Sequence, residues 1–167
     1  IISAHESTED RGDTPSAGIF AGITLVVYGK SGAGKTAFCS KLADTLRVAE
    51  EAARRENEDT YEPRPVLLRF CGTSPGSGTG TMLLLNLCRQ IHYILDKNED
   101  DIPQTYSGRV RHFHGLLASH AMIVVIDSLD QLSNDDEARS NLTFLRNIKP
   151  HPRTLIIVST IPDDRES

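Results

Sequence analysis

The sequence predicts an α/β fold in which a parallel sheet lies between two layers of helices. Short apolar runs alternate along the chain with longer segments of helical periodicity. The apolar runs are continuous rather than alternating, which is typical of parallel strands buried on both faces. The first of them leads directly into a glycine-rich segment that ends in Gly-Lys-Thr at residues 34–36. Together these observations predict a three-layer P-loop NTPase fold.

The order of the elements follows from the same patterns. Pro63 and Pro65 precede one apolar run and Pro150 and Pro152 another, as expected at strand boundaries. We expect strands at 23–28, 66–70, 121–126 and 155–159. We expect helices from residue 34 into the mid-fifties, around 84–95, up to about residue 120, and over about 135–147. The fourth strand should lie between the first and the third.

The domain organisation is simple. A chain of 167 residues suits one domain with its own core. Residues 1–19 are small and polar, which predicts a flexible leader or linker. Residues 20–167 are expected to form a nucleotide-binding domain.

Residues 29–36, Gly-Lys-Ser-Gly-Ala-Gly-Lys-Thr, match the phosphate-loop pattern G-x-x-x-x-G-K-[ST] at every position. Gly29 and Gly34 allow backbone conformations that a Cβ would obstruct, so that amide groups can turn toward an anion. The amino end of the following helix adds partial positive charge. Lys35 supplies an ammonium group for the β- and γ-phosphates, and the Thr36 hydroxyl can bind Mg²⁺. We therefore expect a nucleoside triphosphate to be bound by Gly29, Lys30, Ser31, Gly32, Ala33, Gly34, Lys35 and Thr36.

A carboxylate ends the third predicted strand. Asp127 follows the apolar residues 122–126, which is the Walker B arrangement, in which an aspartate reaches Mg²⁺ opposite the loop hydroxyl. The alternative is a turn or capping role for Asp127. Asp130 either orients or deprotonates the attacking water or is a turn residue. We expect Lys35, Asp127 and Asp130 to be catalytic, with Thr36 and Asp127 as metal ligands.

The last predicted strand ends in two hydroxyl groups, Ser159 and Thr160. If this strand lies between the first and the third, one of these hydroxyls lies near the γ-phosphate and can respond to its presence. We expect Ser159 in the binding site. The alternative is an ordinary strand end that is satisfied by solvent.

Composition argues against several classes of function. The net charge of -5, the pI near 5.6 and the 5% aromatic content disfavour a nucleic-acid surface. No apolar run approaches the roughly 18 residues that a membrane span needs. Cys39, Cys71 and Cys88 lack metal-ligand spacing and fit reduced, buried thiols. These features favour a cytoplasmic location.

Several segments resemble NACHT domains of the STAND class of NTPases, and most of all those of NACHT-and-WD-repeat proteins. These segments are Arg-Phe-Cys-Gly-Thr-Ser-Pro at 69–75, Asp-Ser-Leu-Asp-Gln-Leu-Ser at 127–133 and Val-Ser-Thr-Ile-Pro at 158–162. The likeness covers about residues 23–164. It implies an ATP/ADP-controlled switch with Mg²⁺ that governs self-association, in longer chains that carry sensor repeats. It also implies that this chain stops before the fifth strand of the family fold.

The sequence departs from the family pattern in places that bear on activity. Ser128 replaces a glycine, and Gln131 replaces a second acidic residue and cannot act as a base, which predicts slow turnover. The family's phosphate-sensing arginine has no counterpart at 159–162. A binding-only scaffold is therefore one alternative. A P-loop small-molecule kinase is another; its lid would need Arg109, Arg111, His112 and His114. A GTPase is disfavoured because no N-K-x-D motif is present.

Overall fold

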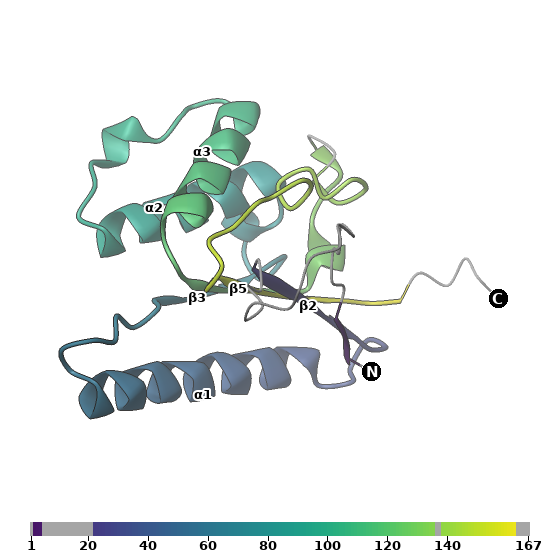
Figure 1. Cartoon of the computed structure of the whole chain (residues 1–167). Coiled ribbons are helices and arrows are strands. Elements are labelled where there is room, and N and C mark those ends of the chain that lie inside the picture. Colours follow the sequence, from purple (N-terminus) through teal and green to yellow (C-terminus); the bar gives the residue numbers. More distant parts are fainter. Residues whose placement is uncertain (1, 5–21, 136–137, 163–167) are drawn as a thin grey trace, which may run out of the picture.

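The computed structural model describes residues 2–4, 22–135 and 138–162, and these form a sheet with helices on both faces (Figure 1). The strands are β1 (Ile2–Ala4), β2 (Ile23–Tyr28), β3 (Val66–Phe70), β4 (Ile123–Asp127) and β5 (Leu155–Thr160). They lie in the order β1-β2-β5-β4-β3. All neighbours from β2 to β3 are parallel, whereas β1 pairs antiparallel with β2. The predicted parallel sheet, with the last strand between the first and the third, is confirmed.

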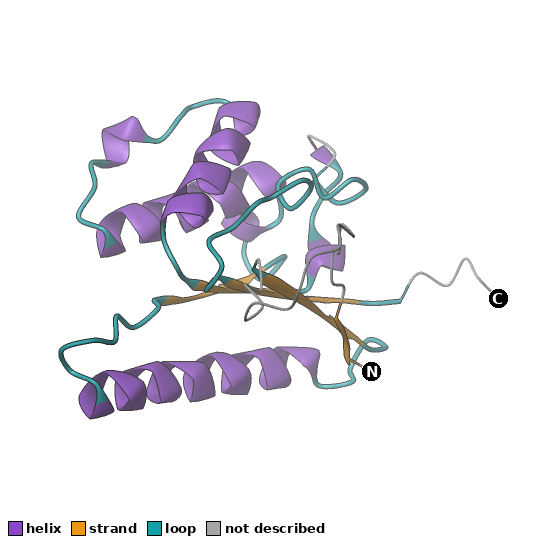
Figure 2. Ribbon diagram, in the orientation of Figure 1, coloured by secondary structure: helices purple, strands orange, loops and turns teal. Residues whose placement is uncertain are grey.

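The helices cover the two faces of the sheet unequally. Among the described helices, α1 (Lys35–Glu56) lies on one face, and α2 (Gly80–Ile94) and α3 (Tyr106–Ser119) lie on the other (Figures 1 and 2). Short 3₁₀ turns are η1 (Pro75–Ser77), η2 (Glu99–Asp101) and η3 (Leu129–Gln131). Thr79 and Thr105 begin α2 and α3, where their hydroxyls accept hydrogen bonds from backbone amides three residues later. This is the three-layer architecture that the sequence predicts.

Strand β4 is the centre of the core, and all five of its residues are buried. Val124 and Ile126 pack in the cluster under α2 and α3, while Ile123 and Val125 pack in the cluster under α1. Successive side chains of a strand point to opposite faces, so a strand covered on both faces must be apolar at every position. That requirement explains the continuous apolar run that ends at Asp127.

Two features of the fold differ from the sequence expectations. Ile2–Ala4 form a strand, although they belong to the stretch expected as a leader; residues 5–19 of that stretch lie outside the described residues. The predicted helix at 135–147 is wrong, since residues 138–147 form turns. Leu142 and Asn147 have φ values of 45° and 56°, a left-handed conformation that an α-helix cannot contain.

Contacts with α3 account for those turns. The Tyr106 and Thr143 hydroxyls share a hydrogen bond of 2.8 Å, and His114 Nε2 lies 2.9 Å from the Phe144 carbonyl oxygen. Phe144 is fully buried in the core under α2 and α3. Tertiary packing therefore overrides the helical periodicity of this segment.

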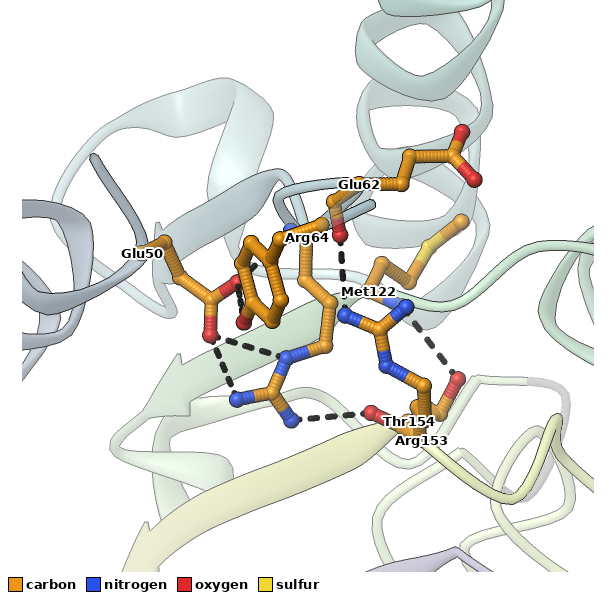
Figure 3. Close-up of polar contacts among 7 residues, drawn as sticks. Glu50, Glu62, Arg64, Met122, Arg153 and Thr154 are labelled. Carbon is orange, nitrogen blue, oxygen red and sulfur yellow. Dashed lines mark hydrogen bonds and ion pairs between the residues drawn. The ribbon is translucent and has the colours of Figure 1, made fainter. Parts of the chain in front are cut away.

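A buried ion pair links the second half of α1 to the segments that lead into β3 and β5 (Figure 3). Glu50 is 6% exposed, and its carboxylate accepts hydrogen bonds from the Arg64 guanidinium, the Arg64 backbone amide and the Tyr61 hydroxyl. Arg64 also donates to the Arg153 carbonyl, and Arg153 donates to the Glu62 carbonyl. Burial raises the pKa of Glu50, but the Arg64 and Tyr61 hydrogen bonds outweigh it and lower that pKa below its usual range.

Candidate functional site

The loop at residues 29–36 turns tightly between β2 and α1. Gly32 and Gly34 have φ values of 77° and 83°, which a residue with a Cβ adopts only with strain. Gly29 has no positive φ; a Cβ there would instead lie 3.3 Å from the Cβ of Ala33. Of the two glycines singled out from the sequence, Gly34 provides backbone freedom and Gly29 provides room for the loop to fold back on itself.

The ammonium group of Lys35 lies across this loop. Its Nζ donates to the Gly29 carbonyl at 2.6 Å and to the Lys30 carbonyl at 3.1 Å. The Ala33 amide also donates to the Lys30 carbonyl, which closes the turn. The loop therefore holds one mobile positive charge beside its own backbone, where anionic oxygens could replace the two carbonyls.

Thr36 and Asp127 come together as the sequence predicts, although 91 positions separate them. The Thr36 hydroxyl donates to Asp127 Oδ2 at 2.6 Å. Asp127 is 1% exposed and ends β4. Parallel strands bring their carboxyl ends to one edge of the sheet, and the loop that follows β2 lies at that edge. A hydroxyl and a carboxylate in contact are a donor set that fits a hard divalent cation such as Mg²⁺.

Ser159 also contacts this carboxylate, but not in the way the sequence suggested. Its hydroxyl donates to Asp127 Oδ1 at 2.5 Å and accepts from the Ser128 amide at 2.8 Å. The residue is fully buried and is not among the described residues that line the cavity beside the loop. We therefore replace the expectation of a direct phosphate contact with a different role: Ser159 holds Asp127 in place from the neighbouring strand.

Cys39 is a neighbour of the site that sequence reasoning did not identify. Its thiol is fully buried beside Asp127 and Ser159. Burial, followed by the charge of Asp127, raises the pKa of Cys39 to about 11, so the thiol remains protonated. The available signal was spacing, because a residue three positions after Thr36 lies on the same face of α1.

Asp130 lies on η3, directly after the end of β4. Ser128 precedes it in a left-handed conformation with φ 61°, and this turns the chain back over the loop. Asp130 Oδ2 accepts a hydrogen bond of 2.6 Å from Gln131 Nε2. Its Oδ1 is buried and has no hydrogen-bond partner among the residues that the structure describes.

An open cavity of about 570 Å³ joins the loop to η3. Its walls include the loop from Ser31 to Thr36, the first turns of α1, η3 and Ile161. Lys35 is the one cationic side chain among the described residues that line it. The loop amides and this ammonium suit a polyphosphate, and the Thr36–Asp127 pair suits its metal ion.

The candidate kinase lid is not at this cavity. Arg109 is buried in α3 and donates to the Pro103 and Thr81 carbonyls. His112 pairs with His92, and His114 with the Phe144 carbonyl. Arg111 is exposed on the same helix. Within the described residues, none of the four lines the cavity, and three have structural partners elsewhere.

The three thiols are buried, as the sequence predicts. Cys39, Cys71 and Cys88 are all buried and unpaired. None of the helices in the described ranges combines the length and the apolar character that crossing a membrane would require.

Comparison with known proteins places this site in a family. A family model described as "AAA domain" matches residues 22–162. The chain is also similar to NACHT and WD repeat domain-containing protein 2 of Homo sapiens, with 29% identity over 149 residues, and to the Mus musculus protein of that name, with 30% identity over 149 residues. Each match covers 83% of this chain and 8% of the relative, so the chain spans a small part of these proteins. The chain belongs to the AAA domain family and is a P-loop NTPase domain similar to that of a NACHT protein.

Proposed function

We propose that this domain binds ATP with Mg²⁺ and hydrolyses it slowly, and that the bound nucleotide controls self-association of a longer chain. The P-loop fold and the likeness to NACHT proteins support nucleotide binding. The regulatory part of the proposal rests on the resemblance of residues 127–133 and 158–162 to the NACHT pattern.

One observation carries the proposal: the Thr36 hydroxyl and the Asp127 carboxylate are in contact at 2.6 Å beside the loop that holds Lys35. A phosphate loop alone would support anion binding. The added hydroxyl–carboxylate pair is the arrangement that P-loop NTPases use for the metal of a bound triphosphate.

Different residues of the site would bind the phosphates, the metal ion and the attacking water. The amides at 31–36 and the Lys35 ammonium would bind phosphate oxygens, and Lys35 would exchange its two loop carbonyls for them. Thr36 and Asp127 would hold Mg²⁺, which neutralises phosphate charge when bound. Asp130, at the wall of the cavity, would orient the attacking water.

The hydrogen bonds around Asp127 suggest how a nucleotide could act on the fold. Asp127 joins α1 through Thr36 and joins β5 through Ser159, and the Ser128 amide binds the same serine hydroxyl. A change at the metal position would therefore reach the ends of two strands and the start of η3. Such a junction can order or release the loops that follow β4 and β5.

The substitution Lys35→Ala tests nucleotide binding. It removes the ammonium but leaves the loop backbone, and we expect ATP affinity to fall at least about tenfold, since hydrogen bonds to charged groups contribute about 1.5–3 kcal/mol. Lys41→Ala, on the exposed side of the same helix, is the matched control. Titration calorimetry with ATP and Mg²⁺ provides the measurement. Equal affinity of the wild type and Lys35→Ala would remove the basis of the proposal.

Three further measurements test hydrolysis, the kinase alternative and self-association. Phosphate release above background would exclude a binding-only scaffold, and transfer of labelled phosphate to an added nucleoside would favour the kinase alternative. Sedimentation velocity with ATP and with ADP tests self-association: sedimentation coefficients that do not depend on the nucleotide would contradict it in this chain.

The three buried, unpaired thiols support a reducing, intracellular setting.

A further inference from the structure

We propose that Gln131 is a positioning residue for Asp130. Its side-chain amide donates a hydrogen bond to the Asp130 carboxylate, which an ionised acidic residue at this position could not do. The inference rests on the proposed hydrolysis of ATP and adds the residue that prepares its carboxylate. It starts from the contact between two adjacent side chains on η3.

The contact is short and directional. Gln131 Nε2 donates to Asp130 Oδ2 at 2.6 Å, while Asp130 Oδ1 is buried without a partner among the described residues. The hydrogen bond fixes the plane of the carboxylate and occupies one of its oxygens. The other oxygen makes no hydrogen bond within the described residues, and Asp130 is one of the residues that line the cavity.

The loop after β3 packs against the Gln131 side chain near its backbone. Gly72 lies against it so closely that a Cβ on Gly72 would be 2.6 Å from the Gln131 Cβ. Gly72 has φ 70°, and its amide donates to the Ser77 carbonyl at 3.0 Å. The preceding amide, of Cys71, donates to the Asp127 carbonyl. This loop therefore packs against the Cβ and Cγ of Gln131, while the glutamine itself remains exposed at the cavity wall.

An acid at position 131 would reverse the interaction. A glutamate has no amide N–H to donate, and two carboxylates at this separation repel each other. Asp130 would then lose its orientation or share a proton with its neighbour. If Gln131 were merely a missing base, Gln131→Glu would accelerate hydrolysis. If Gln131 positions Asp130, the same substitution slows hydrolysis.

The first experiment compares Gln131→Glu and Gln131→Met with wild type, with the exposed Gln104→Glu and Gln104→Met as matched controls. We expect both Gln131 variants to lose about tenfold to a hundredfold in turnover, the effect of losing one hydrogen bond to a charged group. The Gln131→Met variant should keep its ATP affinity within about twofold, since Gln131 acts through Asp130. Turnover in Gln131→Glu at or above wild type would overturn the inference.

A second experiment does not depend on hydrolysis. The side-chain amide protons of Gln131 should resonate downfield in nuclear magnetic resonance spectra and move upfield in Asp130→Ala. Gly72→Ala should shift them as well. Gly76→Ala should not, because a Cβ there would meet no described atom within 4 Å. If the chemical shifts of the Gln131 side-chain amide are the same in wild type and Asp130→Ala, the inference is overturned. Failure of the wild type to bind ATP would overturn the proposed function instead, and the amide signal would still decide whether Gln131 holds Asp130.

Discussion

The Ser159→Ala substitution should destabilise the domain more than its size suggests. The Ser159 hydroxyl is fully buried and makes two hydrogen bonds, one to the Asp127 carboxylate at 2.5 Å and one from the Ser128 amide at 2.8 Å. Loss of a hydrogen bond to a charged group costs about 1.5–3 kcal/mol, and an unpaired buried amide costs about 1–3 kcal/mol. Asp127 keeps its bonds from Thr36 and from the Ser128 hydroxyl, which limits the loss. We therefore expect the free energy of unfolding to fall by about 3 kcal/mol.

The assay is equilibrium unfolding in urea, followed by circular dichroism. The midpoint should fall while the slope stays constant, because the surface exposed on unfolding does not change. The neighbouring Thr160→Ala is the control: the Thr160 hydroxyl donates to the Ile161 carbonyl at 3.3 Å in an exposed position. It should change the free energy of unfolding by less than about 0.5 kcal/mol.

A double-mutant cycle separates the Asp127 contact from the amide contact. In Asp127→Asn, the hydroxyl no longer binds a charged group, so Ser159→Ala should cost less in that background. If Ser159→Ala and Thr160→Ala have equal free energies of unfolding and equal urea slopes, Ser159 does not hold Asp127 at the junction between β4 and β5.

The remaining predictions concern regions away from the cavity. Arg64→Met should lower the free energy of unfolding by about 3–5 kcal/mol at pH 7, because it leaves the Glu50 charge buried without its partner. In urea titrations, the double variant Glu50→Gln with Arg64→Met should lose less free energy of unfolding than Arg64→Met alone. Equal losses in the two variants would contradict this account. Burial, and then the neighbouring His92, lower the pKa of His112. The unfolded chain therefore binds this proton first as the pH falls below about 6.5, so that stability is present above that pH and is lost below it. The urea midpoints at pH 7.5 and pH 5.5 should differ more in wild type than in His112→Asn. If this difference is the same in both proteins, His112 does not cause the pH dependence of stability.

The helix that was wrongly predicted at 135–147 shows where sequence reasoning fails. Its apolar spacing resembles that of a helix, but the spacing arises because Phe144 enters the core between turns. Neither the left-handed conformation of Leu142 nor the hydrogen bond between Tyr106 and Thr143 has a local signal. The hydrogen bond depends on α3, which lies more than twenty residues earlier in the chain.

The phosphate loop and the strands were accessible to sequence reasoning for the opposite reason. The constraints on Gly34, Lys35 and Thr36 lie within a few neighbouring residues, so the pattern itself states them. The buried strands must be apolar at every position because helices cover both faces of the sheet. Local geometry and burial therefore constrain contiguous residues, and their patterns can be recognised in the sequence.

By itself the sequence determined the α/β class, the order of the parallel strands, the phosphate loop and the pairing of Thr36 with Asp127. Only the tertiary structure decided that Ser159 faces Asp127 rather than the cavity, that Cys39 lies beneath it, and that Gln131 binds Asp130 against Gly72. The physical reason is that a residue type and its spacing specify what a side chain can bond. Which of several available partners it does bond depends on distances between segments far apart in the chain, and these are fixed only when the sheet and its loops pack together.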